Sequence, residues 1–148
     1  MKFTVSSSEL FEVLQYVGKA INTKQTMPIL DYFLFVLKDN KLEITASDQE
    51  TSQISVLEVS QEEAGEVAVP ARLIQDSLKE FSDQPITIGS NPDTFEITIA
   101  WESGSLVIPG MSAVGYPNVK EKNEEALKWF SISSSDLMDG ISKTIFAA

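Results

Sequence analysis

The sequence predicts an α+β fold in which two helices pack on one face of an antiparallel sheet. Two observations lead to this prediction. The order strand, helix, three strands occurs twice along the chain before residue 110. In addition, the residue types of positions 3–21 return at positions 130–148. We therefore expect an internally duplicated first domain at residues 1–120, a linker at 121–128 and the truncated start of a second domain at 129–148.

The opening segment predicts a strand, a cap and a helix. Ser6 is a suitable N-cap, and Glu9 three residues later completes a capping box. Ser133 and Asp136 repeat this arrangement, so the second copy is expected to form the same strand, cap and helix. The distance between the copies is far longer than a solenoid repeat and indicates duplication of a whole domain.

The stretch after the first helix predicts three strands. Residues 29–37 form an apolar run typical of a central strand, and residues 42–46 and 54–56 alternate between apolar and polar side chains. The alternation changes phase between Leu57 and Val59, which indicates a bulge. Aromatic side chains of the central run are expected in the core and not on a surface that stacks bases. These are Tyr32, Phe33 and Phe35.

The second half predicts one strand, one helix and three more strands. Val67 and Val69 indicate a short strand, and Pro70 suits the first turn of a helix at residues 71–81. The expected apolar face of this helix consists of Leu73, Ile74, Leu78 and Phe81. The later strands are expected at residues 86–88, 95–101 and 106–108. The polar stretch from about residue 111 to 128 is typical of an interdomain linker.

The composition excludes several classes of function. The chain has no cysteine and no histidine, which excludes thiolate chemistry and removes the commonest metal ligand and general base. We expect neither a metal nor a cofactor. The sequence shows no charged and apolar leader and no apolar run long enough to cross a membrane, so we expect a soluble, cytoplasmic protein without a membrane partner. The formal net charge of -11 argues against nucleic acid, because phosphates are bound by Lys and Arg.

Five short motifs nevertheless resemble those of a known family. They are MKFTV at the N-terminus, NTKQTMPIL at 22–30, ASDQE at 46–50, VPAR at 69–72 and YP at 116–117. In this order they resemble the bacterial sliding clamp, the beta subunit of DNA polymerase III. The resemblance implies a ring of two protomers, each with three similar domains whose helices line the inside. It also implies a processivity factor for the replicative polymerase, without a catalytic site of its own.

The resemblance answers the objection raised by the charge. A ring that encloses duplex DNA holds it topologically and needs only weak, sequence-independent phosphate contacts. Lys24 is expected to face the DNA because it aligns with a basic position of the family, and Arg72 because it lies in the VPAR motif. Lys19 and Lys79 are weaker candidates on the same helices. From the residues alone, all four could equally be a solvated helix surface.

The resemblance also implies a protomer interface. In the family the last strand of this domain is a sheet edge that pairs with the third domain of the partner protomer. Leu106 and Ile108 are the matching apolar residues. The alternative is that both side chains face the core of their own domain. Polymerase and clamp loader would bind a peptide pocket between the second and third domains, which lies beyond residue 148.

Two other functions remain open. A carboxylate-dependent hydrolase needs one acid and base pair, for which Asp31, Asp48 and Glu50 are the candidates. Asp48 and Glu50 follow a strand end, however, and fit a turn equally well. The chain could also be a stand-alone interaction module, because apolar residues of the last helix would need a partner. They are Leu137, Met138, Ile141, Ile145 and Phe146.

Overall fold

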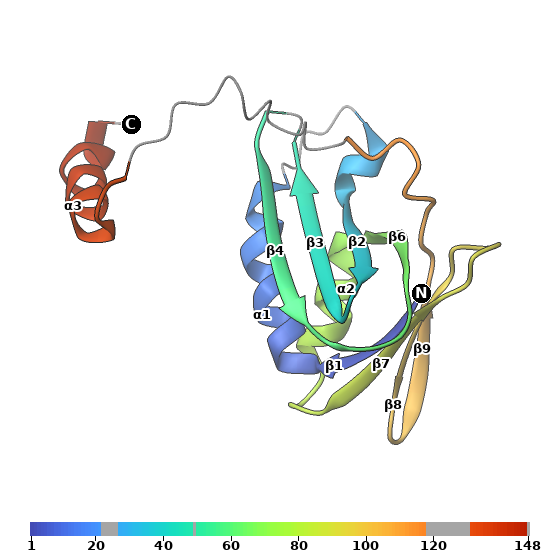
Figure 1. Cartoon of the computed structure of the whole chain (residues 1–148). Helices are drawn as coiled ribbons and strands as arrows, with labels where there is room; N and C mark the ends of the chain where they lie inside the picture. The colour runs from blue at the N-terminus through green and yellow to red at the C-terminus, as the bar shows by residue number, and fades with distance from the viewer. Residues whose placement is uncertain (22–26, 49, 118–130, 148) are drawn as a thin grey trace. The chain divides into compact units, whose positions relative to one another are not determined.

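The computed structural model describes residues 1–21, 27–48, 50–117 and 131–147 (Figure 1). The chain divides into two compact units, residues 1–117 and 118–148, which we call unit 1 and unit 2. Each unit is considered by itself. None of the described helices is long and apolar enough to cross a membrane.

The described part of unit 1 contains two antiparallel sheets. The first sheet has the order β5 (Ser60–Glu63), β1 (Lys2–Ser6), β7 (Pro85–Ser90), β8 (Ile97–Trp101) and β9 (Gly104–Ile108). The second has the order β4 (Ser52–Glu58), β3 (Lys41–Ser47), β2 (Tyr32–Lys38) and β6 (Gly65–Pro70). The α+β class is therefore confirmed, but the expectation of one sheet was wrong.

Strand exchange between the halves explains the two sheets. β1 pairs with β7, with Phe3 opposite Ile88, whereas the three strands that follow it in sequence lie in the second sheet. In the same way β6 pairs with β2, with Val69 opposite Phe33, and the strands after it lie in the first sheet. Local periodicity contains no information about such long-range pairing. The internal duplication itself stays a prediction.

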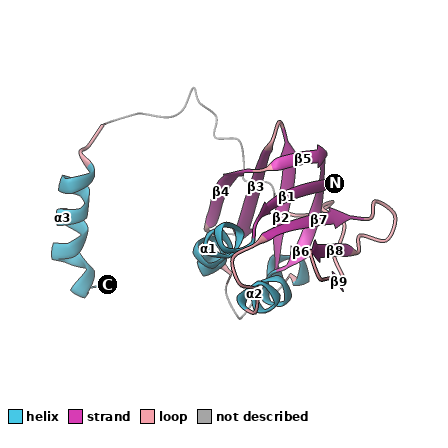
Figure 2. Cartoon of the chain, turned by 90° about the horizontal axis from the view of Figure 1, so that it is seen from below, coloured by secondary structure: helices cyan, strands magenta, loops and turns pink. Residues whose placement is uncertain are grey.

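Two helices of unit 1 lie side by side below the sheets (Figure 2). α1 (Ser7–Val17) buries Leu10, Leu14 and Val17 and leads into the short 3-10 helix η1 (Gly18–Ala20). α2 (Ala71–Lys79) buries Ile74 and Leu78. Leu73, expected on the buried face, is 46% exposed, because it lies about 100° around the helix axis from Ile74 and farther still from Leu78.

Three consecutive serines tie the start of α1 to the chain after α2. Ser6 accepts a hydrogen bond from the Glu9 N–H at 3.3 Å, which confirms it as the N-cap. Ser7 Oγ donates to the Ser82 carbonyl at 3.0 Å and accepts from the Gln84 N–H at 3.1 Å. Ser8 donates to the Asp83 carboxylate, and so does Ser6, at 2.8 Å.

These contacts predict an acidic shift for Asp83. Hydrogen bonds from Ser8 and then Ser6 hold the pKa of the Asp83 carboxyl below its ordinary value of 3.8. The contacts therefore contribute stability above the ordinary value, and the contribution is lost as pH falls through the lowered pKa. In Ser8→Ala, an NMR titration should show the pKa of Asp83 moving up toward 3.8. Ser55→Ala, on β4, is the control, and an unmoved Asp83 in Ser8→Ala would contradict the prediction.

The predicted bulge after β4 is a crossing between the sheets. The chain leaves the second sheet at Glu58, buries Val59 and joins the edge of the first sheet at Ser60. The phase shift was therefore a correct observation with the wrong interpretation. Residues 28–31 also differ from expectation, since they form the 3-10 helix η2 (Pro28–Asp31) before β2 begins.

Residues 111–117, whose polar composition is typical of a linker although the expected first domain extends to residue 120, belong to unit 1. Met111 exchanges two backbone hydrogen bonds with Ala68 of β6, at 2.9 and 3.0 Å. Tyr116 is buried, and its hydroxyl shares its single proton between the carbonyls of Tyr32 at 3.0 Å and Thr45 at 3.1 Å. Polar composition misled the prediction here, because the contacts of this segment are made by its backbone and one phenol.

The core of unit 1 lies where helices and sheets meet. Phe33 and Phe35 have no exposed surface, as the core interpretation of these aromatics predicts. Phe81 and Trp101 meet edge to face, with ring centroids 4.8 Å apart at the margin of the core.

Unit 2 contains α3 (Ser134–Thr144) followed by the 3-10 helix η4 (Ile145–Ala147). Ser133 accepts a hydrogen bond from the Asp136 N–H at 3.1 Å, so the second predicted cap is confirmed. The strand expected before it is not formed in residues 131–133. A strand needs a neighbour to receive its backbone hydrogen bonds, and the described part of unit 2 has none.

Candidate nucleic-acid interface

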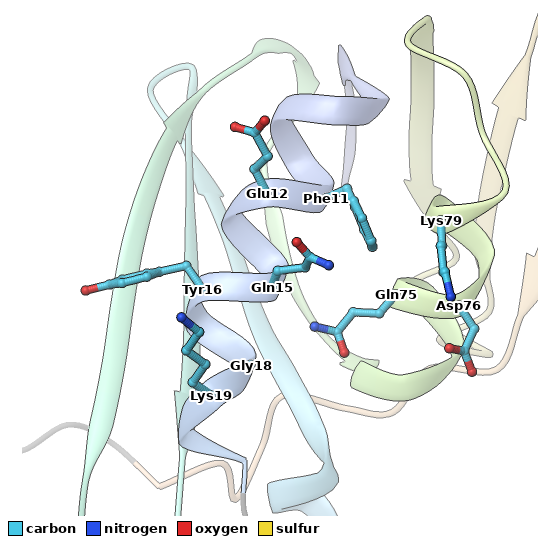
Figure 3. A pocket seen from close by; sticks show the side chains of 9 residues that line it. All are labelled: Phe11, Glu12, Gln15, Tyr16, Gly18, Lys19, Gln75, Asp76 and Lys79. Atoms are coloured by element: carbon cyan, nitrogen blue, oxygen red, sulfur yellow. The ribbon is translucent and has the colours of Figure 1, made fainter.

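An open groove of about 680 Å³ runs between α1 and α2 (Figure 3). Phe11 and Gln15 project from α1 toward the groove, and Gln75 projects from α2 toward α1. The remaining lining residues are charged or lie at the end of α1. They are Glu12, Tyr16, Gly18, Lys19, Asp76 and Lys79.

A second hollow of about 650 Å³ adjoins the groove. The two share Gly18, Gln75 and Asp76, and the second hollow adds Arg72. Three of the four predicted DNA-facing residues therefore line two connected hollows on the helical side of unit 1. The fourth, Lys24, lies outside the described residues.

The three cations on this side are exposed and free of ion pairs. Among the described residues, none of Lys19, Arg72 and Lys79 takes part in a salt bridge. The ammonium of Lys19 lies 5.9 Å from the centre of the Tyr16 ring, on its face. An exposed cation without a carboxylate partner can bind a phosphate without first breaking an ion pair. Glu12, Asp31 and Asp76 line the same two hollows, so the three positive charges are matched by three negative ones and the surface is mixed in charge.

Two glutamines hold the C-terminal end of α1. Gln75 of α2 donates from Nε2 to the Leu14 carbonyl at 2.8 Å. The end of the Gln53 amide on β4 that faces α1 lies 2.9 Å from the Tyr16 carbonyl and 3.1 Å from the Val17 carbonyl. Because both neighbours are acceptors, the atom there is assigned as the amide nitrogen, which donates to both. Gly18 makes room for this arrangement, because a Cβ there would lie 2.7 Å from the Gln75 Nε2.

The glutamines and Tyr16 were missed from the sequence. Gln53 and Gln75 occupy ordinary positions of a strand and a helix, so no local pattern distinguishes them. Tyr16 could have been found, because helical spacing places it away from Leu10, Leu14 and Val17. The structure leaves 57% of Tyr16 exposed.

The predicted interface residues lie on β9, which is an edge of the first sheet. Ile108 is buried in the core of unit 1, and Leu106 is half-buried against it. Val107, between them, is 55% exposed. The side chains of Leu106 and Ile108 thus face their own domain, and their role in a protomer interface stays a prediction.

The candidate acids do not assemble into a catalytic site. Asp48 Oδ1 accepts hydrogen bonds from the N–H groups of Glu50 at 3.1 Å and Thr51 at 2.7 Å, which is the arrangement of an Asx turn. Asp31 lines the second hollow at its other end, beside Tyr32. No metal-binding group of acids occurs among the described residues. The turn interpretation accounts for Asp48 and Glu50.

Comparison with known proteins identifies the family. A family model described as "DNA polymerase III beta subunit, N-terminal domain" matches residues 1–120. The chain belongs to this family. The resemblance noted in the sequence is thereby confirmed, and the DNA polymerase III beta subunit family is one of non-catalytic processivity factors.

Individual members of the beta subunit family show how much of a clamp this chain spans. It is 32% identical to the "Beta sliding clamp" of Vibrio harveyi, over 99% of this chain and 100% of that relative. It is 31% identical to the "Beta sliding clamp" of Vibrio cholerae, over 99% of this chain but 40% of that relative. The chain therefore spans all of one relative and about two fifths of the other.

Solved structures agree with the beta subunit fold. The DNA polymerase III subunit beta of Pseudomonas aeruginosa has a TM-score of 0.85 at 26% identity, over 96% of this chain and 38% of that one. The pol III beta of Caulobacter crescentus has a TM-score of 0.87 at 20% identity, over 99% of this chain and 39% of that one. At this identity the second likeness shows the fold alone.

Proposed function

We propose that this chain acts as part of a DNA sliding clamp and presents its α1 and α2 side to duplex DNA. The observation that carries the proposal is the group of three exposed cations without ion pairs on two neighbouring helices. In the complete clamp, the ring would encircle the duplex and confer processivity on the replicative polymerase.

The composition of the surface suits sliding. Each phosphate contact adds affinity that depends on salt but not on sequence. A few cations interrupted by Glu12 and Asp76 give weak contacts that exchange easily as the protein moves along the duplex. The net charge of -11 over the whole chain disfavours binding through the other faces.

We also propose that β9 pairs with a partner protomer through its backbone. Edge strands of soluble proteins are usually protected by charges. β5, at the opposite edge of the first sheet, carries Glu62 and Glu63. β9 has no charged residue, and Val107 is exposed on it. Leu106 and Ile108 would hold the strand in place from the core side, while polymerase and clamp loader would contact other domains of the ring.

Neutralisation of the three cations tests the DNA-facing surface. In the triple variant Lys19→Gln, Arg72→Gln, Lys79→Gln, binding to a short fluorescein-labelled duplex should weaken. The slope of log affinity against log salt should become shallower by about three, one unit for each lost phosphate contact. Fluorescence anisotropy between about 50 and about 200 mM salt measures both quantities.

A matched variant distinguishes the effect of where the cations lie from the effect of the net charge of the chain. Lys2→Gln, Lys38→Gln, Lys41→Gln changes the net charge equally, but these residues lie on β1 and at the turn between β2 and β3. It should bind the duplex nearly as well as the parent chain. Equal weakening in the two triple variants would overturn the proposed DNA-facing surface.

A further inference from the structure

We infer that Gln53 and Gln75 are positioning residues that hold the end of α1, and with it Lys19, at the DNA-facing surface. The inference depends on the proposed function of that surface. It concerns two neutral side chains, from β4 and α2, which are proposed to act through the end of α1 and not as charged contacts to phosphate.

The two side chains approach the helix end from different elements. Gln75 reaches across the groove from α2 to the Leu14 carbonyl, as Figure 3 shows for its side chain. Gln53 reaches from β4 to the carbonyls of Tyr16 and Val17. Three carbonyls in the last turn of α1 are thereby hydrogen bonded to α2 and to the second sheet. Both glutamine side chains are half-buried, so water competes little for these bonds.

The glutamines act at the end of α1, where the helix carbonyls carry partial negative charge. α1 has no basic residue in its last turn, and its C-cap Gly18 has right-handed geometry, with φ of -62°. The Gly18 N–H donates to the carbonyls of Leu14 and Tyr16. The glutamines add a second donor to these two carbonyls and one to the carbonyl of Val17, without adding charge to the surface.

Lys19 is the cation most directly affected. It follows Val17 by two residues, in η1, and its ammonium lies over the ring of Tyr16. Gln53 therefore donates to the carbonyl of Tyr16, whose ring lies beneath the ammonium, and to the carbonyl of Val17, the residue that caps η1. If both bonds were lost, the ammonium would sample more positions, and ordering it against a phosphate would cost more conformational entropy.

A double-mutant cycle tests the inference in the 148-residue chain. The pair Gln53→Met, Gln75→Met removes the donors while keeping side-chain length, and Lys19→Met removes the cation. Affinity for a short fluorescein-labelled duplex is measured at low salt for the parent chain, both variants and their combination. The glutamine pair should weaken binding by at least about twofold in the parent chain and not at all in Lys19→Met, because coupled residues are non-additive.

Gln61→Met is the matched control. Gln61 lies on β5 and accepts a hydrogen bond from the Asn40 N–H at 3.1 Å, away from α1. This variant should leave duplex affinity unchanged in both backgrounds. Each single glutamine variant, checked by circular dichroism, keeps the cycle informative should the pair fail to fold.

The possible results separate the two claims. If Lys19→Met leaves affinity and its salt slope unchanged, Lys19 does not contact DNA, and the proposed surface fails at this position together with the inference. If Lys19→Met weakens binding but the glutamine loss is the same with and without Lys19, the glutamines contribute only to general stability, and the inference alone is overturned.

Discussion

Gly110→Ala is expected to destabilise unit 1 by about 3 kcal/mol or more. A Cβ at this position would lie 2.3 Å from the Phe95 carbonyl oxygen and 3.1 Å from the Ala68 carbonyl oxygen. Phe95 lies two residues before β8, in a loop where its N–H donates to the Asn91 carbonyl at 2.9 Å, and Ala68 belongs to β6 of the second sheet. Relaxation would have to shift a hydrogen-bonded backbone on one side or the other, so it is expected to be costly.

Thermal unfolding measures this effect. A loss of about 3 kcal/mol should lower the Tm by roughly 10 °C in a domain of this size. Gly89→Ala on β7 is the control, because a Cβ there would meet its nearest neighbours at 3.9 Å, which is ordinary contact. An unchanged Tm in Gly110→Ala would mean that the sheets can separate at this point without loss of packing.

Tyr116→Phe is expected to cost about 1 to 3 kcal/mol at neutral pH, because it leaves buried carbonyls without a donor. The Tyr116 hydroxyl serves the carbonyls of Tyr32 and Thr45. Tyr32 lies opposite Pro70 in the β2 and β6 pairing, and Pro70 has no N–H to offer. Chemical denaturation of the parent chain and the variant measures the difference directly.

The same substitution should change the response to alkali. Burial raises the pKa of Tyr116 to about 12 from its ordinary value of 10.0, although a backbone hydrogen bond from Ser47 opposes the shift. A raised pKa contributes stability that is complete below pH 10 and is lost as pH rises to about 12. The parent chain should therefore lose up to about 3 kcal/mol more than Tyr116→Phe over this interval.

Absorbance near the phenolate band supplies an independent check. Tyr116→Phe should remove the late titration, whereas Tyr16→Phe, at a tyrosine that is 57% exposed, should leave it in place. If Tyr16→Phe removed the late titration and Tyr116→Phe did not, the assignment of the raised pKa to Tyr116 would be wrong.

Local patterns predicted most elements of unit 1. The serine cap, the apolar stripe of α1 and the alternation of β3 and β4 are properties of adjacent residues, and each element formed where expected. In β4, however, the alternation did not predict burial, because Ile54 and Val56 are 44% and 53% exposed. Their assembly was a different problem. Nothing near β1 in the sequence indicates that its neighbours will be β5 and β7, because strand pairing is decided by contacts between distant residues.

The residues of the candidate interface also fall into two groups, those that the sequence could indicate and those that it could not. Lys19, Arg72 and Lys79 could be proposed from helix positions and family motifs, and the structure brings them to one side of unit 1. Gln53 could not be proposed, because its partners lie on a different element. Gly110 could not either, since the close approach of two carbonyls appears only when both sheets are assembled.

The exchange of β1 and β6 between the sheets has a consequence for how the chain folds. Thr4 and Thr87, hydrogen bonded at 2.9 Å, are 83 residues apart, so β1 must wait for β7 before its sheet can form. Neither the first nor the second half of unit 1 contains all the strands of either sheet. Unit 1 should therefore fold slowly for its size and melt in a single transition, because long-range pairing makes its two halves depend on each other. On a ribosome, the first strand made would be among the last to find its place.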